Sequence, residues 1–136
     1  MPFDEIQTGS VVTYQYLWLR ESAAGQSDGR KDRPVVVGIR LSRAKSDFVY
    51  FLPITTQPPR HDTIAIEVPQ IERKRAGLDV DRQQWIIMSE YNADEIPGSW
   101  VLEPDAKIGE FSKAFFQKVI KLWLANFKRS SRIERQ

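Results

Sequence analysis

Positive charge is concentrated immediately before an apolar run near the start of the chain. Arg30, Lys31 and Arg33 precede Pro34, and three valines follow at residues 35–37. An arginine side chain carries five N–H donors in a planar fork, which matches two oxygens of a phosphate. Because Arg33 adjoins a predicted strand, its backbone is expected to be fixed while a ligand approaches its guanidinium. This pattern is typical of an anion-binding position.

Two threonines, Thr55 and Thr56, lie where another predicted strand ends, in the segment "FLPITTQPP". If residues 34–41 and 47–55 form an antiparallel hairpin, the start of the first strand lies beside the end of the second. Arg33 and Thr55 would then share one rim. Taken alone, Thr55 is better explained by ordinary β-propensity followed by a turn.

The composition indicates one domain and excludes several kinds of site. The chain has 136 residues, of which 41% are apolar, enough for one core. We expect a domain over residues 1–127 and a basic, disordered tail over residues 128–136, which has little apolar surface. The absence of cysteine excludes disulfides and thiolate sites, and a single histidine, His61, argues against a zinc cage. No metal or cofactor is expected.

The sequence predicts neither a membrane span nor a signal peptide. No apolar run approaches the roughly 20 residues of a membrane span, and Asp4 and Glu5 lie where a signal peptide carries cations. We therefore expect a cytoplasmic protein with no membrane association.

The net charge of +2 is too small to indicate a partner, but the cations are clustered. Residues 30–45 hold six cations and one acid, and residues 113–135 hold seven cations and one acid. The second cluster is interpreted as a solvated helix face and tail, with DNA binding as a weaker alternative. The first lies in a loop and at strand edges, which favours a binding role.

Short apolar segments dominate the chain and predict a mainly β fold with flanking helices. We expect a small curled sheet or partly open barrel of five to seven strands, closed by a C-terminal helix with helical spacing of its apolar residues. The expected strands are 10–21, 34–41, 47–55, 63–68 and 84–91, with a possible sixth at 100–104; the expected helices are 69–78 and 111–127.

Three of these segments, in this order, resemble the MazF/PemK (Kid) family of type II toxin–antitoxin toxins. "TGSVVTYQY" is similar to the first strand of that family, "RPVVVG" to its arginine–proline strand, and "FLPITTQ" to its proline–threonine segment. "WIIMSEYNADEIPG" is similar to a later strand, after which the family carries further site residues. The resemblance covers about residues 8–100 in order and spacing.

The resemblance implies an SH3-like barrel, a homodimer, and metal-independent cleavage of single-stranded RNA. It implies that Arg33 and Thr55 are catalytic: they would stabilise the charge that accumulates when a ribose 2′-OH attacks its 3′ phosphate. The products would be a 2′,3′-cyclic phosphate and a 5′-OH. It also implies a cognate antitoxin, commonly an acidic and partly disordered segment that blocks the site.

The chain departs from the family pattern at two places. Ser10 replaces an aspartate of the first strand, and Asn92 stands where some members have an arginine. Asn92 cannot act as an acid, so Asp94 and Glu90 are equally plausible catalytic carboxylates. His61 is a candidate helper and an equally plausible exposed loop residue. The candidate RNA-binding residues are Arg20, Arg30, Lys31, Thr56, Gln57, His61 and Asn92.

Trp18 lies two residues before Arg20 and has two interpretations. Both side chains could stack on or hold unpaired bases, although burial of Trp18 in the core is the simpler assignment. The main functional hypothesis is an endoribonuclease toxin. The alternative is a non-catalytic RNA- or protein-binding module on the same fold, which the missing arginine favours.

Overall fold

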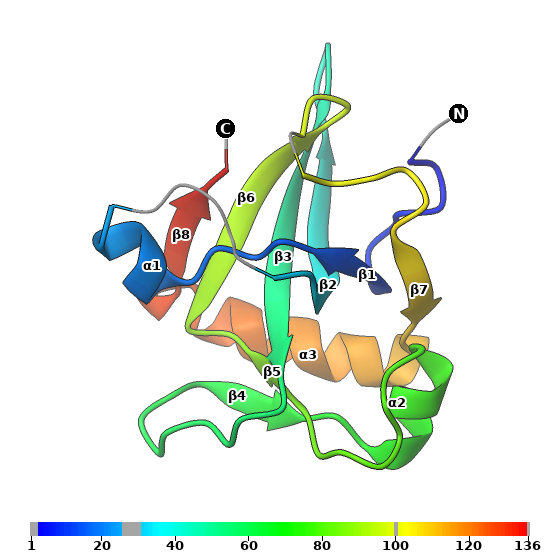
Figure 1. Ribbon diagram of the computed structural model, residues 1–136, viewed down its shortest axis with the longest axis vertical. Helices are drawn as coiled ribbons and strands as arrows, with labels where there is room; N and C mark the ends of the chain where they lie inside the picture. Colours follow the sequence, from blue (N-terminus) through cyan, green and yellow to red (C-terminus); the bar gives the residue numbers. More distant parts are fainter. Residues whose placement is uncertain (1–2, 26–30, 100, 136) are drawn as a thin grey trace.

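The computed structural model describes residues 3–25, 31–99 and 101–135. They form one mainly β unit with three α-helices (Figure 1). The elements are β1 (Ser10–Tyr14), α1 (Leu19–Ala23), β2 (Arg33–Ser42), β3 (Asp47–Thr55), β4 (Ala65–Glu67), α2 (Gln70–Arg75), β5 (Trp85–Ile87), β6 (Glu90–Ile96), β7 (Lys107–Glu110), α3 (Lys113–Ala125), a 3-10 turn η1 (Phe127–Arg129) and β8 (Ser131–Glu134).

The strand β3 is the centre of the sheet. One of its edges pairs with β2, which leads outward to β1 and β7. Its other edge is shared: residues 47–51 pair with β6, and residues 54–55 pair with β5, which leads to β4. Among the described residues no pairing joins β4 to β7, so the sheet stays open. All of these pairs are antiparallel except that between β6 and β8.

The strands β2 and β3 form a long hairpin whose residues alternate between two apolar layers. Val36 and Leu52 face one layer, and Val35 and Phe51 face the other. The pairing register shifts between Val37 and Ile39. An added Cβ on Gly38 would lie 2.7 Å from the Trp123 ring, so glycine allows α3 to pack directly on the strand.

The helix α3 covers one face of the sheet and crosses behind the strands in Figure 1. It begins at Ser112, whose hydroxyl accepts a hydrogen bond from the backbone N–H of Phe115. The buried Glu72 of α2 accepts from the backbone N–H and the hydroxyl of Ser112, both at 2.8 Å. This contact joins α2 to the start of α3. No helix within the described residues is long and apolar enough to cross a membrane.

The expected strand over residues 10–21 is shorter than predicted. It ends at Tyr14, and Leu19–Ala23 forms α1 instead. The aromatic residues that suggested a strand, Tyr16 and Trp18, are buried as an irregular segment against the second apolar layer. The possible strand at 100–104 is not seen over the described residues 101–104, and β7 follows at residues 107–110.

The prediction of a disordered tail over residues 128–136 is wrong for the described residues. The strand β8 pairs in parallel with β6, and Ile133 is only 3% exposed. Arg132 donates a hydrogen bond to the Tyr50 hydroxyl at 2.7 Å, and Arg135 donates to the carbonyl of Gln15. One apolar residue and two arginines therefore order a segment whose composition alone indicates a solvated tail.

Candidate functional site

Arg33 and Thr55 lie on the same rim of the sheet. Arg33 is the first residue of β2, and Thr55 is the last residue of β3. Val35 pairs with Pro53, so two further steps along the antiparallel ladder bring position 33 opposite position 55. Both residues line two adjoining cavities, of about 590 and 360 Å³. The shared rim expected from the hairpin is therefore present.

The larger cavity, here called the Trp18 pocket, is rich in arginine. Its polar lining includes Arg20, Arg33, Thr55, Gln57, Arg60 and Glu90. Trp18 forms part of its wall and is 7% exposed, so the interpretation of Trp18 as a core residue is confirmed.

The indole of Trp18 positions two of these arginines. The guanidinium carbons of Arg20 and Arg33 lie 5.1 and 5.3 Å from its ring centroid, within the range of cation–π attraction. The ring thus fixes two cations at one pocket while leaving their N–H groups available to an anion.

Glu90 brings a carboxyl group to the Trp18 pocket from the start of β6. Its Oε1 atom accepts hydrogen bonds from the Tyr16 hydroxyl at 3.1 Å and from the backbone N–H of Leu19 at 2.9 Å. Burial raises the pKa of Glu90 above its ordinary value, and these two hydrogen bonds oppose the shift without cancelling it. A carboxyl group with a raised pKa is suited to proton transfer nearer neutral pH.

Asp94, a predicted catalytic carboxylate, lies outside the lining of both pockets. Its side chain is 2% exposed, and its Oδ2 atom accepts from the hydroxyls of Tyr14 and Ser99, each at 2.6 Å. Burial, followed by the charge of Asp94, raises the pKa of Tyr14. Asp94 is a structural group that joins β6 to β1 and to the loop after β6.

Asn92, a predicted RNA-binding residue, also lies outside the lining of both pockets. It has no exposed surface, and its amide makes two hydrogen bonds of 2.8 Å with the backbone N–H and carbonyl of Leu17. The side-chain amide thus pairs with the backbone of the irregular segment after β1, as a neighbouring strand would. Arg135 also donates to Asn92 Oδ1, at 3.2 Å.

The remaining predicted residues are divided between the two pockets. Arg20 and Gln57 line the Trp18 pocket, whereas Lys31 and Thr56 line the smaller one. His61 is exposed and lines neither, in agreement with its interpretation as a loop residue. Arg30 lies outside the described residues.

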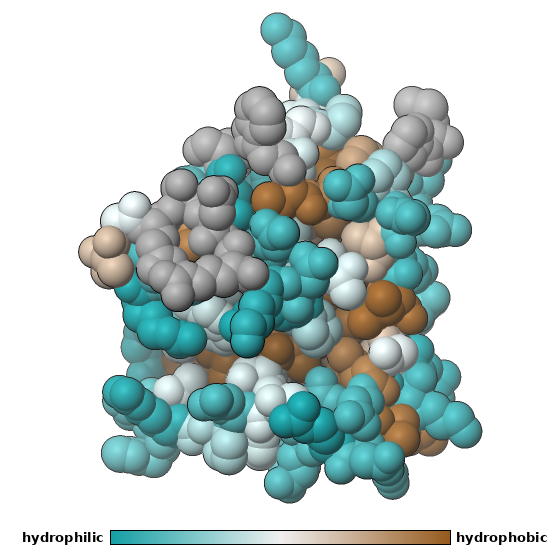
Figure 2. Space-filling model, in the orientation of Figure 1, coloured by the Kyte–Doolittle hydropathy of each residue, from teal (hydrophilic) through white to brown (hydrophobic). Residues whose placement is uncertain are grey.

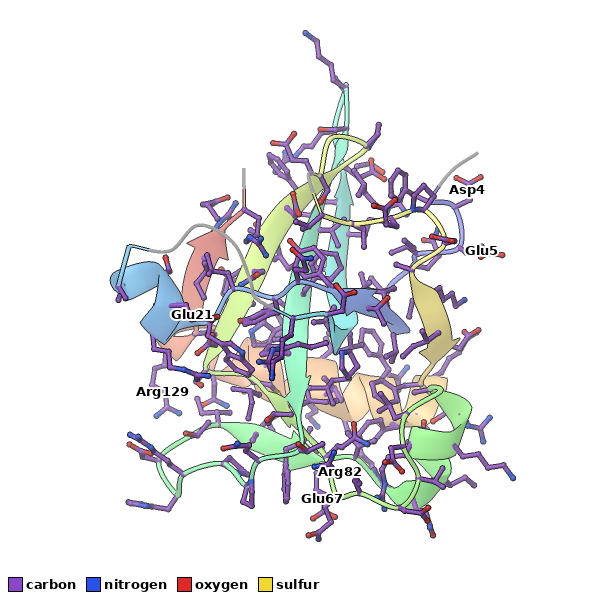
Figure 3. The ribbon with its side chains drawn as sticks, viewed as in Figure 1. Asp4, Glu5, Glu21, Glu67, Arg82 and Arg129 are labelled. Atoms are coloured by element: carbon purple, nitrogen blue, oxygen red, sulfur yellow. The ribbon has the colours of Figure 1, made fainter. Side chains whose placement is uncertain are left out.

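The smaller cavity, here called the Gln84 pocket, was not foreseen. Its apolar walls come from Pro34, Ile54, Leu78 and Ile108, and its polar lining adds Asp79, Arg82 and Gln84 to residues 31–33, 55 and 56. Figure 2 shows a furrow with an apolar floor crossing this face above β4, and Figure 3 shows Arg82 at the lower end of the molecule.

The sequence did not predict that Arg60 lines the Trp18 pocket. It also did not predict the Gln84 pocket. Arg60, Asp79 and Arg82 lie in polar segments between elements, where nothing in the residue types separates a pocket lining from a solvated loop. The described residues contain no group of three or more histidine, aspartate or glutamate side chains arranged to hold a metal ion.

No protein-family model, curated protein or solved structure matches this chain.

Proposed function

We propose that the protein is a MazF/PemK-like endoribonuclease that cleaves single-stranded RNA at the rim formed by Arg33 and Thr55. The observation that carries this proposal is that both residues line the same two cavities, next to the carboxyl group of Glu90. A cation, a hydroxyl and a carboxyl with a raised pKa are the groups that phosphodiester cleavage through a ribose 2′-OH requires.

In the proposed reaction the 2′-oxygen attacks the adjacent phosphorus and the 5′-oxygen of the next nucleotide leaves. Glu90 accepts the proton of the 2′-OH, and water supplies a proton to the departing 5′-oxygen. Arg33 and the Thr55 hydroxyl donate hydrogen bonds to the phosphorane oxygens, whose negative charge is greatest in the transition state. The products are a 2′,3′-cyclic phosphate and a 5′-OH, and the proposed reaction requires no metal ion.

Arg33 suits this role because its guanidinium is already oriented. Stacking on Trp18, which is itself buried, restricts the side chain before RNA arrives. Less conformational entropy is then lost on binding. Arg20 and Arg60 line the same pocket and would hold phosphates that flank the cleaved one.

The proposal extends to the architecture and partners of that family. We propose that the open sheet is a variant of the SH3-like barrel, that the chain forms a homodimer, and that it acts in the cytoplasm. An acidic antitoxin segment would occupy the Trp18 pocket, where three arginines offer complementary charge.

The test is incubation of the purified protein with mixed-sequence RNA in EDTA. Fragments ending in a 2′,3′-cyclic phosphate are expected, and Arg33→Ala is expected to lower the cleavage rate by about 100-fold or more. Arg43→Ala is a matched control, because Arg43 also stacks on an aromatic ring, that of Phe48 at 5.2 Å, but lines neither pocket. Intact RNA, or equal cleavage by Arg33→Ala, would refute the proposal.

A second candidate function is RNA binding without cleavage. It is favoured by the burial of Asp94, which leaves Glu90 as the one carboxyl group in the lining of the Trp18 pocket among the described residues. In that case the same incubation yields protein–RNA complexes, which Arg33→Ala weakens, and no fragments.

A further inference from the structure

The side-chain amide of Gln84 has a fixed orientation at the wall of the Gln84 pocket. Its Nε2 group donates to two backbone carbonyls, those of Asp79 at 2.9 Å and Arg82 at 3.4 Å. Carbonyls accept hydrogen bonds and cannot donate them, so the amide nitrogen of Gln84 must face these two carbonyls. The amide oxygen, Oε1, then points away from them. No described residue donates to that Oε1, and Gln84 lines the pocket, so this oxygen is available to a donor of a bound molecule.

An acceptor at the wall of a pocket that no described protein group uses can receive a hydrogen bond from a ligand that enters the pocket. The rest of the pocket describes this ligand. The apolar side chains of Pro34, Ile54, Leu78 and Ile108 suit a flat ring. The volume of about 360 Å³ lies within the range of about 300–1,000 Å³ that small-molecule sites have.

A second acceptor lies in the same lining. Asp79 is exposed, and its Oδ1 atom accepts from the backbone N–H of Asp81 at 3.0 Å, which restrains the carboxylate. Two acceptors favour a ring edge that carries two adjacent N–H donors. Among the four RNA bases only guanine presents such an edge, through N1–H and its exocyclic N2 amino group.

The pocket is held open by backbone contacts at its base. An added Cβ on Gly77 would lie 2.4 Å from the carbonyl oxygen of Ile108, so the backbone just after α2 lies directly against β7. Arg73 donates to the carbonyl of Arg82 and fixes the other end of the loop that carries Asp79 and Gln84. A cavity with fixed walls and fixed acceptors is preorganised for one ligand shape.

We propose that the Gln84 pocket binds a guanine base of the RNA, next to the phosphate at Arg33 and Thr55. Gln84 Oε1 and the Asp79 carboxylate accept the N1–H and N2–H donors of the base, and the apolar side chains enclose its ring. The proposal deepens the proposed ribonuclease function and depends on it for the identification of RNA as the ligand. Lys31 and Arg82, also in the lining, place positive charge beside the adjoining phosphates.

The test does not require cleavage. Guanosine, adenosine, cytidine and uridine 3′-monophosphates are titrated into the labelled protein, and the NMR shifts of the Gly77 and Leu78 amides are followed. We expect guanosine 3′-monophosphate to bind about tenfold more tightly than the other three, the effect of one charge-assisted hydrogen bond. Asp79→Asn, which keeps Oδ1 for the turn and replaces the second acceptor by a donor, should remove the preference.

Two further variants complete the design. Asp81→Asn has the same change of charge two residues away, outside the pocket lining, and should bind as the wild type does. Gln84→Met removes Oε1 at similar volume and should also lose the preference. If its thermal unfolding shows a folding defect, Asp79→Asn still decides the question.

The results separate this proposal from the ribonuclease function. Equal affinity for the four nucleotides, a preference for another base, or a guanine preference unchanged in Asp79→Asn overturns the guanine pocket, even if RNA is cleaved. A guanine preference that Asp79→Asn abolishes supports the pocket, and if mixed-sequence RNA then stays intact in EDTA, the ribonuclease function alone fails.

Discussion

The two pockets meet at Arg33 and Thr55 but are built in different ways. The Trp18 pocket gathers residues from segments far apart in the sequence, around 18–20, 55–63 and 87–90, and its lining is dominated by arginines. The Gln84 pocket takes five of its thirteen lining residues from one short segment, residues 77–84. The charge of the Trp18 pocket therefore depends on long-range contacts, whereas the shape of the Gln84 pocket depends in part on a local loop.

The largest effect is expected from removing the amide that supports the Trp18 pocket. In Asn92→Leu the backbone N–H and carbonyl of Leu17 lose their buried partners. At about 1–3 kcal/mol for each of the two unpaired groups, the free energy of unfolding should fall by about 2–6 kcal/mol. Urea denaturation measures this loss. Asn126→Leu removes a partly buried hydrogen bond to the Leu122 carbonyl and an exposed one from Arg129, and should cost only about 1 kcal/mol. Equal losses in the two variants would contradict the supporting role of Asn92.

A slightly smaller loss is expected at the C-terminal strand. Ile133→Ala deletes a side chain that is 3% exposed between β8 and β6, which should cost about 2–4 kcal/mol. Thermal unfolding measures it, with the exposed Arg129→Ala as the control. If both variants unfold like the wild type, residues 131–134 do not form a packed strand.

The next effect depends on pH and concerns Glu90. Its pKa in the folded protein is raised above the ordinary value of about 4.5, so the folded state binds more protons than the unfolded state between these two values. The wild type should therefore lose stability relative to Glu90→Gln as pH rises from about 4.5 through the raised pKa, and the difference should be constant above it. Urea denaturation at several pH values measures the difference. A difference that stays constant with pH, or a wild type that gains stability instead, would show that the Glu90 pKa is not raised.

The smallest effect is expected from removing one arginine of the Trp18 pocket, which changes the charge of that pocket and not the shape of the Gln84 pocket. Arg20→Ala removes an exposed cation that stacks on Trp18, and it should weaken RNA binding a few-fold. It should also reduce the slope of log affinity against log salt concentration by about one. Asp79→Asn should lose the guanine preference, whereas Arg20→Ala should keep the preference of the wild-type protein. An unchanged salt slope in Arg20→Ala would show that this arginine contacts no phosphate.

Sequence reasoning predicted the parts of the molecule whose pattern is local. The strands β2 and β3 and the helix α3 follow from apolar periodicity, and their hairpin register correctly brought Arg33 and Thr55 to one rim. The strand β8 escaped prediction because its single buried apolar residue, Ile133, gives no periodic signal.

The places of Asn92 and Asp94 in the fold depend on tertiary contacts. Asn92 and Asp94 looked like site residues because they are polar and follow a strand. Their side chains instead satisfy Leu17, Tyr14 and Ser99 in the interior. Neither residue type nor spacing could indicate that an irregular segment 75 residues away would need these partners.

The hydrogen bond between Arg135 and the carbonyl of Gln15 joins positions 120 residues apart. During synthesis the segment before Trp18 leaves the ribosome early. Its partner Arg135 is added only after nearly all of the other described residues. Nascent or prematurely terminated chains that lack residue 135 therefore lack this hydrogen bond to the segment that leads to Trp18.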